Sequence, residues 1–169
     1  MHYKVPDDVI ARYAPGFAIM MNNQFDHRGM VLRSVIDLEH EFKLYLLTAL
    51  RKVNSEISDD ELEENGIFSE PNMLSSLSKC LTLANLLNLI DQPLTQDIKK
   101  LIRLRNMYAH GRHRKQLYED TNAMALVLSL QIYKNTKDEL DKYDQQGIFL
   151  SCAKAITEII SEKRSSFGS

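Results

Sequence analysis

The segment Asp26–Val53, DHRGMVLRSVIDLEHEFKLYLLTALRKV, carries a strongly regular hydrophobic pattern. Its apolar residues recur in alternating steps of four and three, which places them on one continuous face of an α-helix. These residues are Val31, Val35, Leu38, Phe42, Tyr45, Ala49 and Val53. Charged residues lie off that face or at its edge. The segment therefore predicts a long amphipathic helix with one buried side.

Further helices are expected on the C-terminal side of this segment. A second main helix is predicted from about residue 69 to 90, and the triplet Asp91-Gln92-Pro93 then interrupts the chain. A third helix is expected over Gln96–His110, with Thr95 as its N-cap and Gly111 as the residue that ends it.

The remaining sequence also favours helices. A fourth is predicted over about 120–140 and a fifth over about 146–164, while one or two short helices are expected within 7–21. Residues 55–66 are acidic and predict a loop with a short helical turn. Since no stretch shows a convincing β alternation, the expected fold is an all-α helical bundle of about five main helices.

The length of 169 residues predicts a single helical domain spanning 1–169, with an N-terminal extension at 1–24, the bundle at 25–164 and a polar tail at 165–169. The hydrophobic fraction of 44% and the charged fraction of 26% are ordinary for a soluble globular protein. The N-terminus shows no signal-peptide core, and the longest uncharged apolar stretch, 121–133, is too short to cross a bilayer. We expect no membrane association.

The two cysteines, Cys80 and Cys152, are isolated and lack metal-ligand spacing. They favour a reduced, cytoplasmic protein, and they are expected to pack as small apolar groups. Neither a metal site nor a cofactor is expected, because the sequence has no Gly-rich phosphate loop and no clustered ligand set.

A local basic patch contrasts with the net charge of −2. Seven of the 21 lysines and arginines fall within a 17-residue window that contains no acid. They are Lys99, Lys100, Arg103, Arg105, Arg112, Arg114 and Lys115. His110 and His113 add to this window. The window predicts an anion-binding surface, although most such runs are solvated helix faces.

Within this window, the hexapeptide Arg105–His110, RNMYAH, combines a permanent cation with a titratable imidazole. His110 would lie in the last turn of the third helix, where the helix dipole favours the imidazolium. Arg105 offers forked donors that fit phosphate. Five residues correspond to about 500° of helix rotation, so the two side chains lie about 140° apart. They would converge only if the helix tightens or where two such helices meet.

A purely structural interpretation of the hexapeptide is also open. Arg105 could form an ion pair with Asp37, Glu39 or Glu41 of the first long helix. In that interpretation His110 would cap carbonyl groups at the end of its own helix. On residue types and spacing alone, this alternative is the more common outcome for such a pattern.

The stretch Leu101–Gly111, LIRLRNMYAHG, resembles the signature of HEPN domains, which carry an Arg, usually a polar residue after it, three variable residues and then a His. Arg105 and His110 match the two defining positions, and Asn106 matches the polar one. The order of helices from about 26 to 130 resembles the branch that contains the mannitol operon repressor.

The resemblance implies an all-α homodimer in which two Arg–His helices face each other. It also implies a metal-independent endoribonuclease that acts as a toxin or defence effector. His110 would act on the 2′-hydroxyl and Arg105 would steady the scissile phosphate, with Asn106 and Glu39 in supporting roles. The residues expected to grip flanking phosphates of the RNA are Arg103, Arg112, His113 and Arg114.

Two features limit what the resemblance implies. HEPN toxins with a nucleotidyltransferase antitoxin often carry Tyr two residues after the His, and this chain has Arg112 there. Adenylylation at that position is therefore not expected, although an antitoxin or regulatory protein stays a candidate partner. The repressor branch predicts an alternative function, a non-catalytic transcriptional regulator or protein-interaction module. A third possibility is nucleic-acid binding by the basic patch without chemistry.

Overall fold

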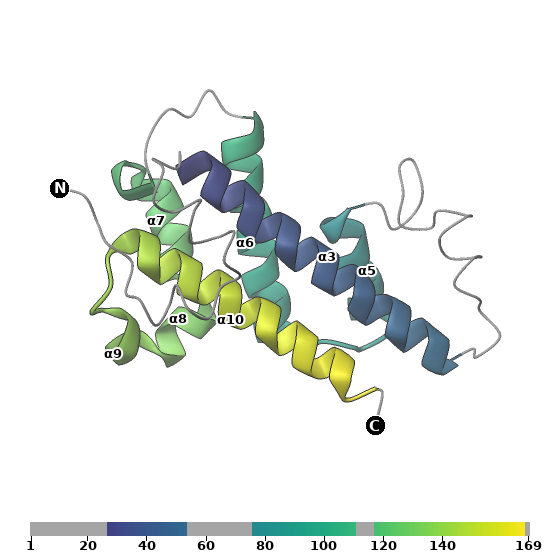
Figure 1. Ribbon diagram of the computed structural model, residues 1–169. Coiled ribbons are helices and arrows are strands. Elements are labelled where there is room, and N and C mark those ends of the chain that lie inside the picture. Colours follow the sequence, from purple (N-terminus) through teal and green to yellow (C-terminus); the bar gives the residue numbers. More distant parts are fainter. Residues whose placement is uncertain (1–26, 54–75, 111–116, 168–169) are drawn as a thin grey trace, which may run out of the picture.

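The computed structural model describes residues 27–53, 76–110 and 117–167. In these ranges the chain folds into helices joined by short turns and contains no strand (Figure 1). This confirms the all-α bundle. The helices predicted within 7–21 and the acidic loop at 55–66 lie outside the described residues.

Two long helices, α3 (His27–Val53) and α10 (Gln145–Ser165), pack side by side and run in the same direction (Figure 1). Near their starts, Gln146 Nε2 lies 3.2 Å from Met30 Sδ. Further along, Arg164 Nη2 near the end of α10 lies 2.9 Å from Glu41 Oε1 in the middle of α3. The predicted first and fifth helices are thereby confirmed, and they form the main pair of the bundle.

The tail that follows α10 is not wholly polar in its contacts. The ring of Phe167 packs on the ring of Tyr45 with a centroid separation of 5.6 Å, and Lys52 Nζ lies 5.5 Å from the centroid of the Phe167 ring. This residue therefore extends the contact between α3 and α10 past the last helical turn.

Helix α6 (Gln92–His110) runs antiparallel to α3. Its last turn lies beside the first turn of α3, where Arg28 Nη2 donates to the Ala109 carbonyl at 3.4 Å. The residues just before α6 lie beside the second half of α3, where the Tyr45 hydroxyl donates to the Leu89 carbonyl at 2.7 Å. Helix α5 (Leu77–Leu86) precedes α6 and packs against both α3 and α6.

The core lies where α3, α6 and α10 meet, and the predicted stripe of α3 faces it. Every residue of that stripe from Val31 to Ala49 is buried, whereas Val53 is 85% exposed. The stripe therefore leaves the core one turn before α3 ends. Large buried side chains on the other two helices include Ile98, Leu101, Leu104, Tyr108 and Phe149.

The predicted junction between the second and third helices is wrong at both of its ends. Helix α5 ends at Leu86 instead of about residue 90, because Asn88 adopts a left-handed conformation with φ of 53°. The amide of Asn88 donates to the Asn85 carbonyl and the amide of Leu89 to the Ala84 carbonyl, which is the hydrogen-bond pattern of a Schellman C-cap.

Helix α6 begins at Gln92, four residues earlier than expected. Asp91, and not Thr95, supplies the side-chain cap, because its Oδ1 accepts from the Leu94 amide at 2.9 Å. Pro93 fits the first turn because its missing N–H has no helical partner there. Thr95 is buried, and its hydroxyl lies 2.8 Å from both the Asp91 carbonyl and Asn85 Oδ1.

The predicted fourth helix is also wrong, because the structure divides it into short pieces. They are the 3₁₀ turn η1 (Leu117–Glu119), α7 (Thr121–Leu128), α8 (Gln131–Asn135) and α9 (Lys137–Leu140). Asp120 caps α7 and Asp144 caps α10, and each carboxylate accepts backbone amides of the turn that follows. Helix α8 has no such cap from its own N-cap residue, Leu130.

A buried carboxylate on α6 supplies the missing cap of α8. Asp97 is 3% exposed, and its oxygens accept from the amides of Gln131 at 2.8 Å and Ile132 at 3.0 Å. Lys100 Nζ lies 3.3 Å from Asp97 Oδ1 and donates to the Ser129 carbonyl at 2.6 Å. The Asp97–Lys100 pair thus joins the end of α7 and the start of α8 to the middle of α6.

Asp97→Ala is expected to lower the free energy of unfolding by about 3 kcal/mol, because it leaves two partly buried amides and a partly buried ammonium group without their partner. Asp37→Ala is the matched control, since its exposed ion pair with Arg33 contributes at most about 0.5 kcal/mol. Urea denaturation followed by circular dichroism measures both. Equal losses in the two variants would contradict the role of Asp97.

Both cysteines lie fully buried in the core, as their expected packing role requires. Burial raises the pKa of the Cys80 thiol to about 11. Burial, with a smaller contribution from the nearby charge of Asp97, raises the pKa of Cys152 to about 12. The thiolate is the reactive form, so both groups should be inert at neutral pH.

We expect thiol alkylation of the native protein at pH 8 to be on the order of 100-fold slower than in the unfolded chain, because the higher pKa lowers the thiolate fraction. Mass spectrometry of iodoacetamide adducts measures this. A native rate equal to that of the unfolded chain would show that the thiols are not shielded.

Candidate functional site

The hexapeptide Arg105–His110 forms the C-terminal end of α6, as predicted. Leu104 and Tyr108 are fully buried and anchor this end to the core, while Arg105, four residues after the buried Leu101, lies on the same side of the helix and is half-buried. Asn106 is exposed. His110 is the last residue of the helix. Its side chain lies outside the described structure.

The three acids that could have formed a structural ion pair with Arg105 all contact other cations. The pairs are Arg33–Asp37 at 3.0 Å, Lys43–Glu39 at 2.9 Å and Arg164–Glu41 at 2.9 Å. The side chain of Arg105 forms no hydrogen bond or ion pair with any residue that the structure describes. The structural interpretation of Arg105 as a partner of α3 is therefore not supported.

Glu39, which was expected to support Arg105, forms an ion pair with Lys43. Glu39 and Lys43 are i, i+4 neighbours on α3, and this spacing satisfies both charges within one helix. Both charges also act on the Cys80 thiol, which places the pair toward α5. Among the described contacts, the charge of Glu39 is therefore satisfied by Lys43 rather than by Arg105.

A solvent-exposed stripe runs along α6 on a different side from its core residues. Its members are spaced by four and three residues and are Gln92, Gln96, Lys99, Arg103 and Asn106, all of them exposed. The backbone position of His110 continues this spacing. The predicted phosphate-binding residue Arg103 therefore shares a helix face with the position of His110, whereas Arg105 does not.

The basic patch is smaller in the described structure than in the sequence. Lys100 contributes little to it, because this side chain is engaged by Asp97 and the Ser129 carbonyl. Lys99 and Arg103 are exposed and form part of the stripe. The predicted RNA-binding residues Arg112, His113 and Arg114 lie outside the described residues, as does Lys115.

Arg28 is a candidate site residue that the sequence did not reveal. Its guanidinium donates to the Ala109 carbonyl, one residue before the end of α6, at 3.4 Å. A cation at this position interacts favourably with the negative end of the helix dipole. No local signal could have identified it, because 81 residues separate the two partners.

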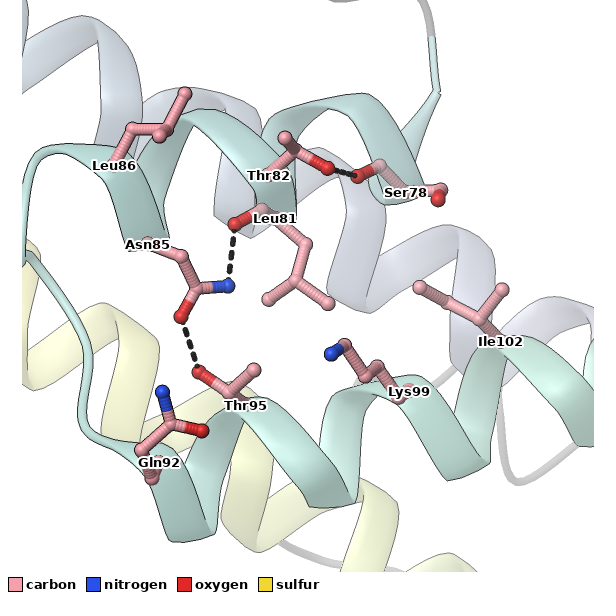
Figure 2. Close-up of a pocket in the computed structure, with 9 residues that line it drawn as sticks. All are labelled: Ser78, Leu81, Thr82, Asn85, Leu86, Gln92, Thr95, Lys99 and Ile102. Atoms are coloured by element: carbon pink, nitrogen blue, oxygen red, sulfur yellow. Dashed lines mark hydrogen bonds between the residues drawn. The ribbon is translucent and has the colours of Figure 1, made fainter.

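A groove lies between α5 and α6, beside the exposed stripe (Figure 2). Its volume is about 440 Å³, within the range of small-ligand sites. Apolar side chains of Leu81, Leu86 and Ile102 line it together with polar ones. Lys99 belongs both to this groove and to the stripe.

Within the described residues, no three His, Cys, Asp or Glu side chains lie close enough to hold a metal ion. The helices of this part of the chain also include none with the length and apolar character needed to cross a membrane. Comparison with known proteins gives no match to any family model, curated protein or solved structure.

Arg105→Met tests whether Arg105 serves the fold. We expect it to change the free energy of unfolding by less than about 1 kcal/mol, because methionine retains most of the stem and no partner is lost. Arg164→Met is the control, and it should cost more because Glu41 stays half-buried without its cation. If Arg105→Met were the more destabilising of the two in urea denaturation, Arg105 would be a structural residue.

Proposed function

We propose that this protein is a metal-independent endoribonuclease of HEPN type, with a site that two subunits of a homodimer complete. The observation that supports the proposal most directly is that Arg105 has no acidic partner on α3. This guanidinium is half-buried, and the acids of α3 that could neutralise it are all bound to other cations. An arginine held in this way is available for the oxygens of a phosphate group.

The proposed reaction is an internal transfer within RNA. His110 accepts the proton of a ribose 2′-hydroxyl, and the 2′-oxygen attacks the adjacent phosphorus. The bond to the 5′-oxygen of the next nucleotide breaks, and that oxygen takes up a proton. The products are a 2′,3′-cyclic phosphate and a 5′-hydroxyl, and Arg105 stabilises the charge that develops on the phosphate oxygens.

The geometry of α6 favours a shared site over a site within one subunit. Arg105 lies on the core side of α6 near its C-terminal end, while the stripe that leads to the position of His110 lies on another side of the helix. In the proposed dimer, two copies of α6 related by a twofold axis would bring the Arg105 of each near the His110 of the other. The dimer is thus the simplest way to place both groups on one phosphate.

The exposed stripe provides contacts for the rest of the strand. Lys99 and Arg103 carry positive charge without a neighbouring acid on their side of α6, and Asn106 adds an amide. Such contacts supply affinity for phosphates without reading the sequence. Arg103 and Lys99 therefore affect binding, while Arg105 and His110 affect the chemical step.

We expect the purified protein to cleave single-stranded RNA in the presence of EDTA and to leave 2′,3′-cyclic phosphate ends. Arg105→Ala and His110→Ala should each lower kcat by about 100-fold or more. Arg103→Ala should mainly raise KM and make it more dependent on salt. Arg33→Ala is the control, because it removes an exposed arginine that serves only an i, i+4 ion pair on α3.

Gel analysis of labelled RNA, with end-group identification by phosphatase sensitivity, measures these effects. Cleavage that stops in EDTA, or that survives unchanged in Arg105→Ala and His110→Ala, would refute the proposal. RNA that is bound but left intact would instead assign the protein to non-catalytic nucleic-acid binders.

A further inference from the structure

The groove between α5 and α6 combines apolar and cationic groups in one open cavity. Leu81 of α5 and Ile102 of α6 lie on opposite walls, and the Lys99 side chain extends toward the space between the helices (Figure 2). Leu86 is 75% exposed at one end of the groove. None of the lining residues that the structure describes is acidic. The cavity is therefore suited to a ligand with an apolar part and a negative charge.

The polar groups of the groove fall into two kinds. Asn85 and Thr95 hold the two helices together, because Asn85 Nδ2 donates to the Leu81 carbonyl and the Thr95 hydroxyl lies 2.8 Å from Asn85 Oδ1. The side chains of Lys99 and Gln92 form no hydrogen bond or ion pair with the described residues. The first kind fixes the shape of the groove, and the second is available to a ligand.

The groove is continuous with the stripe that leads toward the proposed catalytic end of α6. Lys99 lies in the groove, and Arg103 and Asn106 follow it at helical spacing toward His110. At a rise of 1.5 Å per residue, the path from residue 99 to 110 is about 16 Å long. A strand bound at one end of this path can reach the other.

We propose that the groove is a nucleotide-binding subsite for the RNA strand that the α6 end cleaves. Lys99 contacts a phosphate of that strand, the sugar and base pack on Ile102 and the exposed Leu86, and the Gln92 amide hydrogen-bonds the edge of the base. This inference rests on the proposed function and extends it, because it assigns the strand a path along α6. We favour RNA over an acidic peptide as the ligand, because the positive charge of Lys99 in the groove is followed along α6 by that of Arg103 outside it.

Binding of a fluorescent single-stranded RNA by the His110→Ala protein tests this subsite without cleavage. Thr82 lines the groove from α5 and is exposed, and its hydroxyl bonds only to the carbonyl four residues earlier. Thr82→Glu should weaken binding about tenfold relative to Thr82→Gln, because the two side chains differ only in charge. Thermal unfolding of both variants shows that each is folded.

A second pair of variants tests Lys99 itself. Lys99→Gln should lower the slope of log affinity against log salt by about 0.7, the value for one lost phosphate contact on a single strand. Lys134→Gln removes the same charge from the exposed surface of α8 and should leave the slope unchanged. Fluorescence anisotropy at several salt concentrations measures both.

Several results would overturn the subsite. Equal RNA affinity in Thr82→Glu and Thr82→Gln, or an unchanged slope in Lys99→Gln, would show that RNA bypasses the groove. A Thr82→Glu variant that loses self-association in sedimentation experiments would assign the groove to a second copy of this chain. Groove-dependent RNA binding in a protein that cleaves no RNA would refute only the nuclease proposal, so the two failures are distinguishable.

Discussion

The second half of this fold depends on one buried interaction, the carboxylate of Asp97 on the first turn of α8. Short helices are marginal by themselves, and α8 has five residues and no cap from its own sequence. Asp97 supplies that cap from α6, while Lys100 binds the carbonyl of Ser129 that follows α7. Because both helix ends meet the same pair, α7 and α8 are held against the middle of α6.

This interaction also determines which sides of α6 are buried and which remain exposed to solvent. The core face holds Leu101, Leu104 and Tyr108, and the Asp97–Lys100 pair occupies the side toward α7 and α8. The stripe from Gln92 to Asn106 is left exposed to solvent, and Arg105 is left half-buried on the core side. A helix anchored on two sides is a rigid platform for the residues that remain exposed.

Periodicity predicted the long helices well, because α3 and α10 bury one regular face along most of their length. It failed at the predicted fourth helix, since a cap located 34 residues away cannot be seen in a local window. It also missed the left-handed Asn88, whose conformation ends α5. In the site, the position of Arg105 on α6 could be predicted from the sequence. Its lack of an acidic partner could not, because the sequence does not show which cation each acid of α3 contacts.

The sequence alone determined that the chain is helical, which face of α3 is buried, and that Arg105 and His110 lie too far around α6 to meet within one helix. These properties follow from spacing along a single helix, which residue order dictates. Only the tertiary structure decided that Lys100 is withdrawn from the basic patch, that Arg28 joins the end of α6, and that a groove opens beside Lys99. Such features arise from distances between helices, and those distances depend on how all the buried faces pack together.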